Sequence, residues 1–216
     1  MPRSQMNVLA LDTATPSPSV CLLARGELFE ETLSSDRRAS EELLPAVRCV
    51  LEAAGMRLED CDRIAVCAGP GSFTGVRVGL ATAWGLGRAL GIPVEAVSTL
   101  EALAESARGR ADLRVVAALD AGRGDLVCET FVLDPGRARS LAPARLVRHS
   151  DAAGLPGEGP VAALPAGLAG WPAVSEPASV AAALALAVAR SPRPIGSPLS
   201  AIYSRPSAAE EKRGAP

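Results

Sequence analysis

The sequence predicts an α/β fold organised in two lobes. Short apolar runs that are typical of buried strands alternate with segments whose apolar residues recur at the helical period. Strand-like runs begin a second time after Arg108-Gly109-Arg110, which interrupts the apolar pattern. We therefore expect an N-terminal lobe over residues 1–108, a smaller C-terminal lobe over residues 109–190, and a tail over residues 191–216 that crosses back toward the first lobe.

The first lobe is predicted to open with an antiparallel meander, because strand-like runs follow one another with a turn at Arg25-Gly26-Glu27. In the helix that comes next, Pro45 lacks an amide proton, so that helix is expected to start late or to bend there. Ser98-Thr99-Leu100-Glu101 predicts a capping box for a short helix. In order, the expected elements are strands 7–11, 19–24 and 28–33, helix 40–54, strand 64–68, helix 75–90, strand 93–97 and helix 98–107.

The second lobe is predicted from two longer apolar runs, 113–119 and 126–133, which the polar segment 120–125 joins into a strand pair. Shorter strands are expected at 144–147 and 161–164, and a last helix over 179–190. The apolar part of that helix is only about half as long as a bilayer span requires.

Composition excludes several classes of function. A formal net charge of −2 provides no basic surface, and aromatic residues make up 3% of the chain, so strong direct binding of nucleic acid is not expected. The five cysteines are odd in number and form no CxxC pair, which indicates a reducing compartment. No signal peptide or transmembrane run is apparent, so we expect a cytoplasmic protein that does not bind membranes.

The stretch from Gly69 to Gly79 is the most distinctive in the chain. It leads from a strand-like run into a helix, and the two glycines around Pro70 predict a tight turn. Ser72 or Thr74 is expected to cap the helix. Such a turn can bind phosphate, but the glycine spacing differs from that of a P-loop and no lysine is present. The mismatch favours the alternative interpretation, a packing turn without a ligand.

Small residues recur at every fourth position in the helix after this turn. Gly75, Gly79, Ala83 and Gly87 form one ridge along the helix. Glycine inside a helix costs roughly 1 kcal/mol relative to alanine, so the ridge needs a compensating close approach of another backbone. Two interpretations remain open: the ridge packs on the helix's own sheet, or part of it receives a helix from a partner protein.

Seven stretches of the chain match one known family in order: 7–15, 43–45, 69–77, 97–100, 120–121, 123–124 and 201–203. Together they resemble the TsaB (YeaZ) family. The resemblance implies a two-lobed, actin-like ATPase fold of the sugar-kinase type (ASKHA) with a degenerate nucleotide site. It implies a part in making threonylcarbamoyladenosine in tRNA, as the non-catalytic partner of the transferase TsaD. It also implies that the ATPase TsaE joins the same assembly, and a homodimer is expected when TsaD is absent.

The resemblance also implies that the chain has no catalytic residue, cofactor or metal of its own. TsaD-like proteins hold a metal through paired histidines, but the matching segment 36–42 has none, and His149 alone cannot form such a site. The first turn, 13–18, has no glycine and two prolines, which remove two amide donors for phosphate. Asp12, Ser72 and Arg77 are weak candidates for a nucleotide site, and capping the adjacent turn is the favoured interpretation of Asp12.

Three functional hypotheses follow. In the first, the chain is a scaffold that contacts TsaD. In the second, it is an enzyme, either a peptidase or a weak ATPase acting on or with TsaD, although no GxSxG or HExxH motif is present. In the third, it is a regulatory module in which Arg77 faces a nucleotide at the partner interface; a solvated side chain and an intrachain ion pair are the alternatives for Arg77. The first hypothesis places the contact at Leu44, Val47, Leu51, Gly75, Gly79, Ala83 and Leu86.

Overall fold

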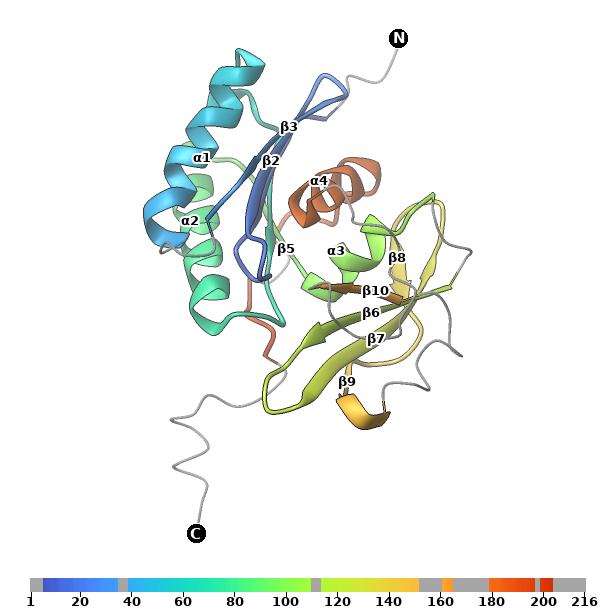
Figure 1. Ribbon diagram of the computed structural model, residues 1–216. Coiled ribbons are helices and arrows are strands. Elements are labelled where there is room, and N and C mark those ends of the chain that lie inside the picture. Colours follow the sequence, from blue (N-terminus) through green and yellow to red (C-terminus); the bar gives the residue numbers. More distant parts are fainter. Residues whose placement is uncertain are drawn as a thin grey trace.

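The computed structural model describes residues 6–34, 39–109, 114–151, 161–164, 179–196 and 199–203. These residues form two β-sheets with a layer of helices between them and two more helices on the outer face of the first sheet (Figure 1). None of the helices in these ranges combines the length and the apolar character that crossing a bilayer would require.

The first sheet has the strand order β3-β2-β1-β4-β5. The pairs β3–β2 and β2–β1 are antiparallel, as the meander predicts, and β1–β4 and β4–β5 are parallel. Every residue of β1, β2 and β4 is buried, so the sheet is covered on both faces. The strands are β1 (Val8–Asp12), β2 (Ser19–Ala24), β3 (Glu27–Thr32), β4 (Arg63–Cys67) and β5 (Val94–Val97).

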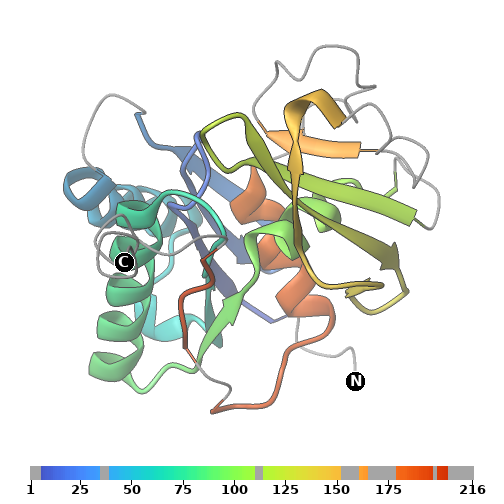
Figure 2. The same cartoon turned by 90° about the horizontal axis from the view of Figure 1, so that it is seen from below.

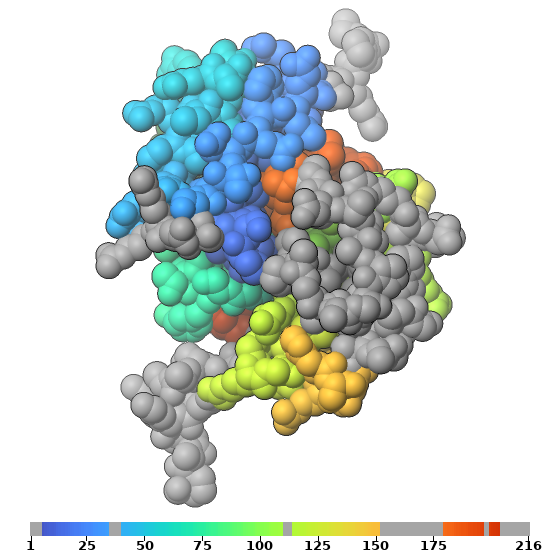
Figure 3. Space-filling model, viewed as in Figure 1, coloured from blue at the N-terminus to red at the C-terminus, as the bar shows by residue number. Residues whose placement is uncertain are grey.

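Helices α1 (Ala39–Ala54) and α2 (Phe73–Leu90) cover the outer face of this sheet. Alternate residues of β1 point to opposite faces, so Leu9 and Leu11 pack in the core beneath α1 and α2. On the face drawn in Figure 3, the two helices form one flank of the molecule. Helix α1 begins at Ala39, before Pro45, so the late start considered for it is wrong.

Helices α3 (Thr99–Ser106) and α4 (Val180–Arg190) lie between the two sheets (Figures 1 and 2). Helix α4, which we expected in the second lobe, contacts β1, β2 and β4 of the first sheet as well as α3. Its N-cap is Ser179, whose hydroxyl accepts a hydrogen bond from the amide of Ala182. The predicted capping box of α3 is wrong, because Ser98 makes no side-chain cap bond. The carboxylate of Glu101 pairs with arginines instead.

The second sheet has the order β10-β6-β7-β8, and β9 also pairs with β7. The β10–β6 pair is parallel and the other pairs are antiparallel. The strands are β6 (Arg114–Asp120), β7 (Asp125–Leu133), β8 (Ala138–Ser140), β9 (Arg145–Arg148) and β10 (Val161–Leu164). Strand β8 and the short 3₁₀ helix η1 (Leu58–Asp60) were not predicted from the sequence.

A buried network of arginine and glutamate side chains joins the two sheets. Glu95 on β5 accepts a hydrogen bond from Nη1 of Arg63 at 3.0 Å and another from Nη1 of Arg137, which precedes β8. Arg137 also pairs through Nε with Glu101 on α3, at 3.0 Å. Arg193, beyond the end of α4, reaches the same two carboxylates with its amide and its guanidinium. Each charge in this network therefore lies beside an opposite charge, as a buried ion requires.

A second cluster surrounds Glu105, one turn further along α3. Its carboxylate accepts hydrogen bonds from Arg108, from Arg190 at the end of α4 and from the amide of Ala138 at the start of β8. Although desolvation acts in the opposite direction, these donors hold the pKa of Glu105 below its ordinary value. The cluster ties α3, α4 and the second sheet together.

Candidate functional site

The glycine turn before α2 is packed tightly between two other segments of the chain. A Cβ on Gly69 would lie 2.2 Å from the carbonyl oxygen of Ile202, and one on Gly71 would lie 2.2 Å from the carbonyl oxygen of Ala14. Gly69 also has a φ of +96°, which side chains rarely adopt. The amide of Ile202 donates to the carbonyl of Ala68 at 2.7 Å, so residues 199–203 cross to the first sheet (Figure 2). The turn is therefore packed against other parts of the chain, which is the packing part of that interpretation.

Ser72 is the N-cap of α2, as the sequence predicts. Its hydroxyl accepts a hydrogen bond from the amide of Gly75 at 3.2 Å, and its own amide donates to the carbonyl of Ala14 at 2.8 Å. Two of the amides that a phosphate would use at this helix end are therefore already bonded within the chain.

Asp12 caps the first turn and is fully buried. Its carboxylate accepts hydrogen bonds from the amides of Ala14 and Thr15, at 2.9 and 3.2 Å, and from the hydroxyl of Thr15. Desolvation raises the pKa of Asp12 above its ordinary value, and these hydrogen bonds offset that effect only in part. The capping interpretation is confirmed, and no oxygen of this carboxylate faces solvent.

A hollow of about 270 Å³ lies between the first turn and the second sheet. The turns that follow β1 and β4 contribute Ala14–Pro16, Gly71 and Ser72. The end of β6 and the turn after it contribute Leu119, Asp120 and Gly122. Asp120 is the only charged residue among the described residues of this lining, and its carboxylate accepts a hydrogen bond from the amide of Gly122 at 2.7 Å. Of these residues, a phosphate placed here would face a carboxylate and no cation.

Arg77 is exposed, as the interpretation as a solvated side chain predicts, but it also contacts two aromatic side chains. Its guanidinium stacks on the ring of Phe73, with its central carbon 3.6 Å from the ring centroid. Its Nε donates to the hydroxyl of Tyr203 at 3.2 Å, and the two aromatic rings lie 5.2 Å apart. Arg77 thus fastens residues 199–203 to α2 through a cation–π contact.

The small-residue ridge of α2 faces the chain's own sheet. A Cβ on Gly75 would lie 1.8 Å from the carbonyl oxygen of Thr13, and one on Gly79 would lie 2.5 Å from the Thr13 hydroxyl. That hydroxyl donates to the carbonyl of Gly75 at 2.7 Å. Ala83 is also completely buried, in the core beneath α2. The predicted contact of Gly75, Gly79 and Ala83 with a partner is therefore wrong, because these small side chains let α2 approach β1.

The apolar residues predicted for the same contact divide into two groups. Val47 and Leu51 of α1 are buried against the sheet, so they too are withdrawn from the predicted surface. Leu86 is half-buried and packs on the same core. Leu44 alone among the predicted apolar residues is exposed, at 52%.

Trp84 of α2 was not predicted to be a contact residue, yet it is exposed at 59%. In the sequence, Trp84 directly follows Ala83 and therefore lies beside the small-residue ridge and not on it. That position could have identified Trp84 as a candidate contact residue.

The described residues hold no group of three or more His, Cys, Asp or Glu side chains placed to share a metal ion. Residues 36–38 of the segment that lacks histidine lie outside the described ranges. His149 follows β9, and its amide donates to the carbonyl of Gly124. All five cysteines are unpaired, as their number and spacing predict, and Cys49 alone among them is exposed.

Comparison with known proteins identifies relatives of this chain. Residues 28–189 match the model of the TsaD family, tRNA N6-adenosine threonylcarbamoyltransferase. The tRNA threonylcarbamoyladenosine biosynthesis protein TsaB of Escherichia coli is 39% identical over 130 residues, which cover 60% of this chain and 56% of that protein. An uncharacterized protein of Mycobacterium bovis is 37% identical over 187 residues, covering 78% of this chain and 86% of the relative.

A crystal structure supports the same grouping. It is that of an uncharacterized Pseudomonas aeruginosa protein with similarity to the peptidase YEAZ, and it superposes with a TM-score of 0.62 at 38% identity. The superposition covers 66% of this chain and 67% of the other.

Proposed function

The chain belongs to the TsaB (YeaZ) group of the TsaD family, with the α/β fold of the actin-like, sugar-kinase type, and from this membership we propose its function. We propose that it is a non-catalytic subunit required for threonylcarbamoyl transfer to adenosine 37 of tRNA. It acts by forming a heterodimer with a TsaD-type transferase and by recruiting TsaE to the pair. In the absence of TsaD the chain pairs with a second copy of itself.

The observation that carries this proposal is the state of the first turn. Asp12, the acidic residue at the end of β1, is fully buried and accepts three hydrogen bonds from its own turn. Among the described residues that line the adjacent hollow, none offers a cation to a phosphate. The polar groups of this first turn are used for contacts within the chain. This supports a role in which the chain binds and positions another subunit.

The proposed contact lies on the outer surface of α1 and α2. With the small-residue ridge turned inward, the exposed apolar side chains of this flank are Leu44 on α1 and Phe73, Trp84 and Leu90 on α2. Exposed Trp and Leu side chains on neighbouring helices provide the apolar centre that a stable heterodimer requires.

Reconstitution tests the proposal. Purified chain, TsaD-type and TsaE-type proteins are incubated with tRNA, threonine, bicarbonate and ATP and the enzyme that makes the threonylcarbamoyl donor, and each protein is left out in turn. Modified tRNA, measured by mass spectrometry of nucleosides, is expected only when this chain is present. The Leu44→Asp variant, which places a charge at the centre of the contact, is expected to abolish copurification with the TsaD-type protein. Full modification without this chain would refute the proposal.

The competing hypothesis is an enzyme, and one structural neighbour is described as similar to a peptidase. Ser72 is the hydroxyl in the distinctive turn, and it accepts a hydrogen bond from Gly75. His149 lies directly after β9, and no bond between it and Ser72 occurs among the described residues. Cleavage of the TsaD-type protein by the purified chain, lost in a Ser72→Ala variant, would establish this hypothesis instead.

A further inference from the structure

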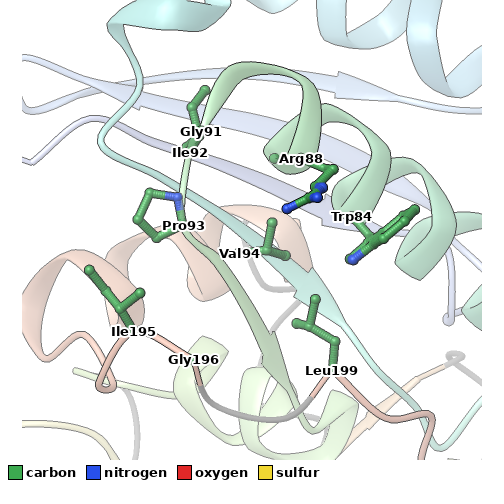
Figure 4. A pocket seen from close by; sticks show the side chains of 10 residues that line it. Trp84, Arg88, Gly91, Ile92, Pro93, Val94, Ile195, Gly196 and Leu199 are labelled. Carbon is green, nitrogen blue, oxygen red and sulfur yellow. The ribbon is translucent and has the colours of Figure 1, made fainter.

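An apolar groove lies between the C-terminal half of α2 and residues 195, 196 and 199. Its volume is about 340 Å³, which is enough for one or two large side chains. Trp84 and Arg88 extend from α2 on one side, Ile195 and Leu199 lie on the other, and Val94 lies between them (Figure 4).

Two bulky apolar side chains at this groove remain in water. Trp84 is exposed at 59% and Ile195 at 75%. Exposed tryptophan is enriched at the energetic centres of protein interfaces, because it offers a large apolar area for little conformational entropy. Covering both side chains would therefore contribute strongly to binding.

Contacts within the chain hold the floor of the groove and the residue two positions before Ile195. A Cβ on Gly87 would lie 2.3 Å from a methyl carbon of Val94, so α2 rests directly on β5. The wall is held at Arg193, whose amide donates to Glu95 at 3.1 Å and whose guanidinium donates to Glu101 and to the carbonyl of Ala96. Nη1 of Arg63 donates to the carbonyl of Arg193 at 2.6 Å. Ile195, two residues further on, is therefore held beside the groove.

Arg88 is the only charged residue of the ten that line the groove. It is exposed, and it has no hydrogen-bond or ion-pair partner within the described parts of the chain. An apolar groove with one unpaired cation at its edge is complementary to a segment that carries a carboxylate beside a bulky apolar side chain.

We infer that this groove docks a segment of the TsaD-type partner that presents a bulky apolar side chain next to an Asp or Glu. The inference rests on the proposed function, and it extends the contact from the outer surface of α1 and α2 to the end of α2. A second copy of this chain fits less well, because groove-to-groove pairing about a two-fold axis would bring Arg88 toward the Arg88 of the other copy.

Affinity measurements with the purified TsaD-type protein test the inference. Trp84→Ala is expected to raise the Kd by about ten-fold or more, because it removes the largest exposed apolar surface at the groove. Arg88→Glu is expected to raise the Kd by a similar factor at about 0.1 M salt. That effect should shrink at about 1 M salt, where the Debye length falls from about 10 Å to about 3 Å. Arg114→Glu is the matched control and should leave the Kd unchanged, because Arg114 is exposed on β6 and its side chain has no hydrogen-bond or ion-pair partner among the described residues.

The outcomes separate this inference from the proposed function. If neither groove variant changes the Kd while Leu44→Asp abolishes binding, the groove is not a docking site and the proposed function stands. If the unmodified chain binds no TsaD-type protein, the proposed function itself fails. If Trp84→Ala dissociates a homodimer, as seen by light scattering, and leaves the Kd for the partner unchanged, a second copy occupies the groove and the inference is overturned. All variants are compared by thermal unfolding, which exposed substitutions should leave near the wild-type value.

Discussion

At the scale of single residues, glycines of helix α2 differ in whether the packing leaves room for a side chain. Gly75 lies against the carbonyl of Thr13 and has no room for a Cβ, whereas Gly85 on the same helix has no atom within 4 Å of that position. Glycine is therefore required at the first position for packing, and at the second it only weakens the helix.

Replacing each of these glycines by alanine separates the two roles. Gly75→Ala is expected to lower the free energy of unfolding by about 1–3 kcal/mol, because the methyl group forces α2 away from β1. Gly85→Ala should raise it by about 0.5–1 kcal/mol through helix propensity. Urea titration measures both, and equal effects of the two changes would contradict the packing described for Gly75.

Asp12 predicts a pH dependence of stability. Burial raises the pKa of Asp12 above its ordinary value of 3.8, so the folded chain holds this proton more tightly than the unfolded chain does. The contribution of the carboxyl group to stability is therefore complete at low pH and declines as the pH rises through the raised pKa. Asp12→Asn removes this titration but keeps an oxygen that can accept the bonds from Ala14 and Thr15.

Unfolding free energies across the acid-to-neutral range test this prediction. The difference between wild type and Asp12→Asn should move in favour of the variant as the pH rises. Glu105, whose lowered pKa produces the opposite trend, is common to both proteins and cancels in the difference. A difference that stays constant, or that favours wild type at higher pH, would show that Asp12 is ionised without penalty.

At the scale of elements, the buried ion network fixes β5, α3 and the β7–β8 turn against one another. The side chain of Arg137 is 9% exposed, and it pairs with Glu95 and Glu101, whose side chains are 1% and 8% exposed. Arg139, two residues away, pairs with Asp134 at the surface, where the two side chains are 63% and 42% exposed. The two arginines therefore make a matched pair, one buried and one exposed.

Arg137→Gln is expected to lower the free energy of unfolding by about 3–5 kcal/mol, because two buried carboxylates lose their shared cation. Arg139→Gln should cost about 0–1 kcal/mol, as is usual for exposed pairs. Denaturant titration of both variants distinguishes these cases. Similar small losses would mean that water or a neighbouring arginine compensates Glu95 and Glu101.

The elements with a clear period could be predicted from the sequence, and those set by tertiary contacts could not. Strand 19–24 has the predicted bounds, and the ends of the other long elements lie within a few residues. The three-residue strand β8 is too short to show a period, because its pairing with β7 defines it. Glu101 matches a capping box locally, but Arg137 and Arg193 compete for its carboxylate more strongly than the helix end does.

The same limit applies to the candidate site. The period of four revealed that α2 has a small-residue face, but a period cannot show whether the chain itself or another subunit covers that face. The cap at Ser72 and the turn at Asp12 involve neighbours in sequence, so both could be predicted. The groove at Trp84 could not, because its wall comes from residues 195, 196 and 199, more than a hundred positions away.

At the scale of the whole molecule, one core spans both sheets. The cluster that contains Val8 and Ala10 of β1 also contains Leu100 of α3, Val115 of β6 and Leu184 of α4. The lobe boundary at residue 108 thus remains a prediction. The apolar cluster between the two sheets is continuous and contains residues from both sides of that boundary.

A continuous core predicts a single cooperative unfolding transition. Amide exchange of β1 and of β7 should show the same limiting free energy of opening, because neither sheet can expose its inner face without the other. Hydrogen exchange followed by mass spectrometry measures both strands in one experiment. Two separate transitions, with β7 opening at much lower free energy than β1, would show that the lobes are independent units.

The inward ridge of α2 has a consequence for genetic screens. In a saturation library selected for pairing with another subunit, intolerant positions should form a stripe at Gly75, Gly79, Ala83 and Gly87. That stripe would resemble a set of interface positions, although these variants lose pairing because they misfold and are degraded. A parallel selection for cellular abundance removes it, and the positions that remain sensitive mark the true face of recognition.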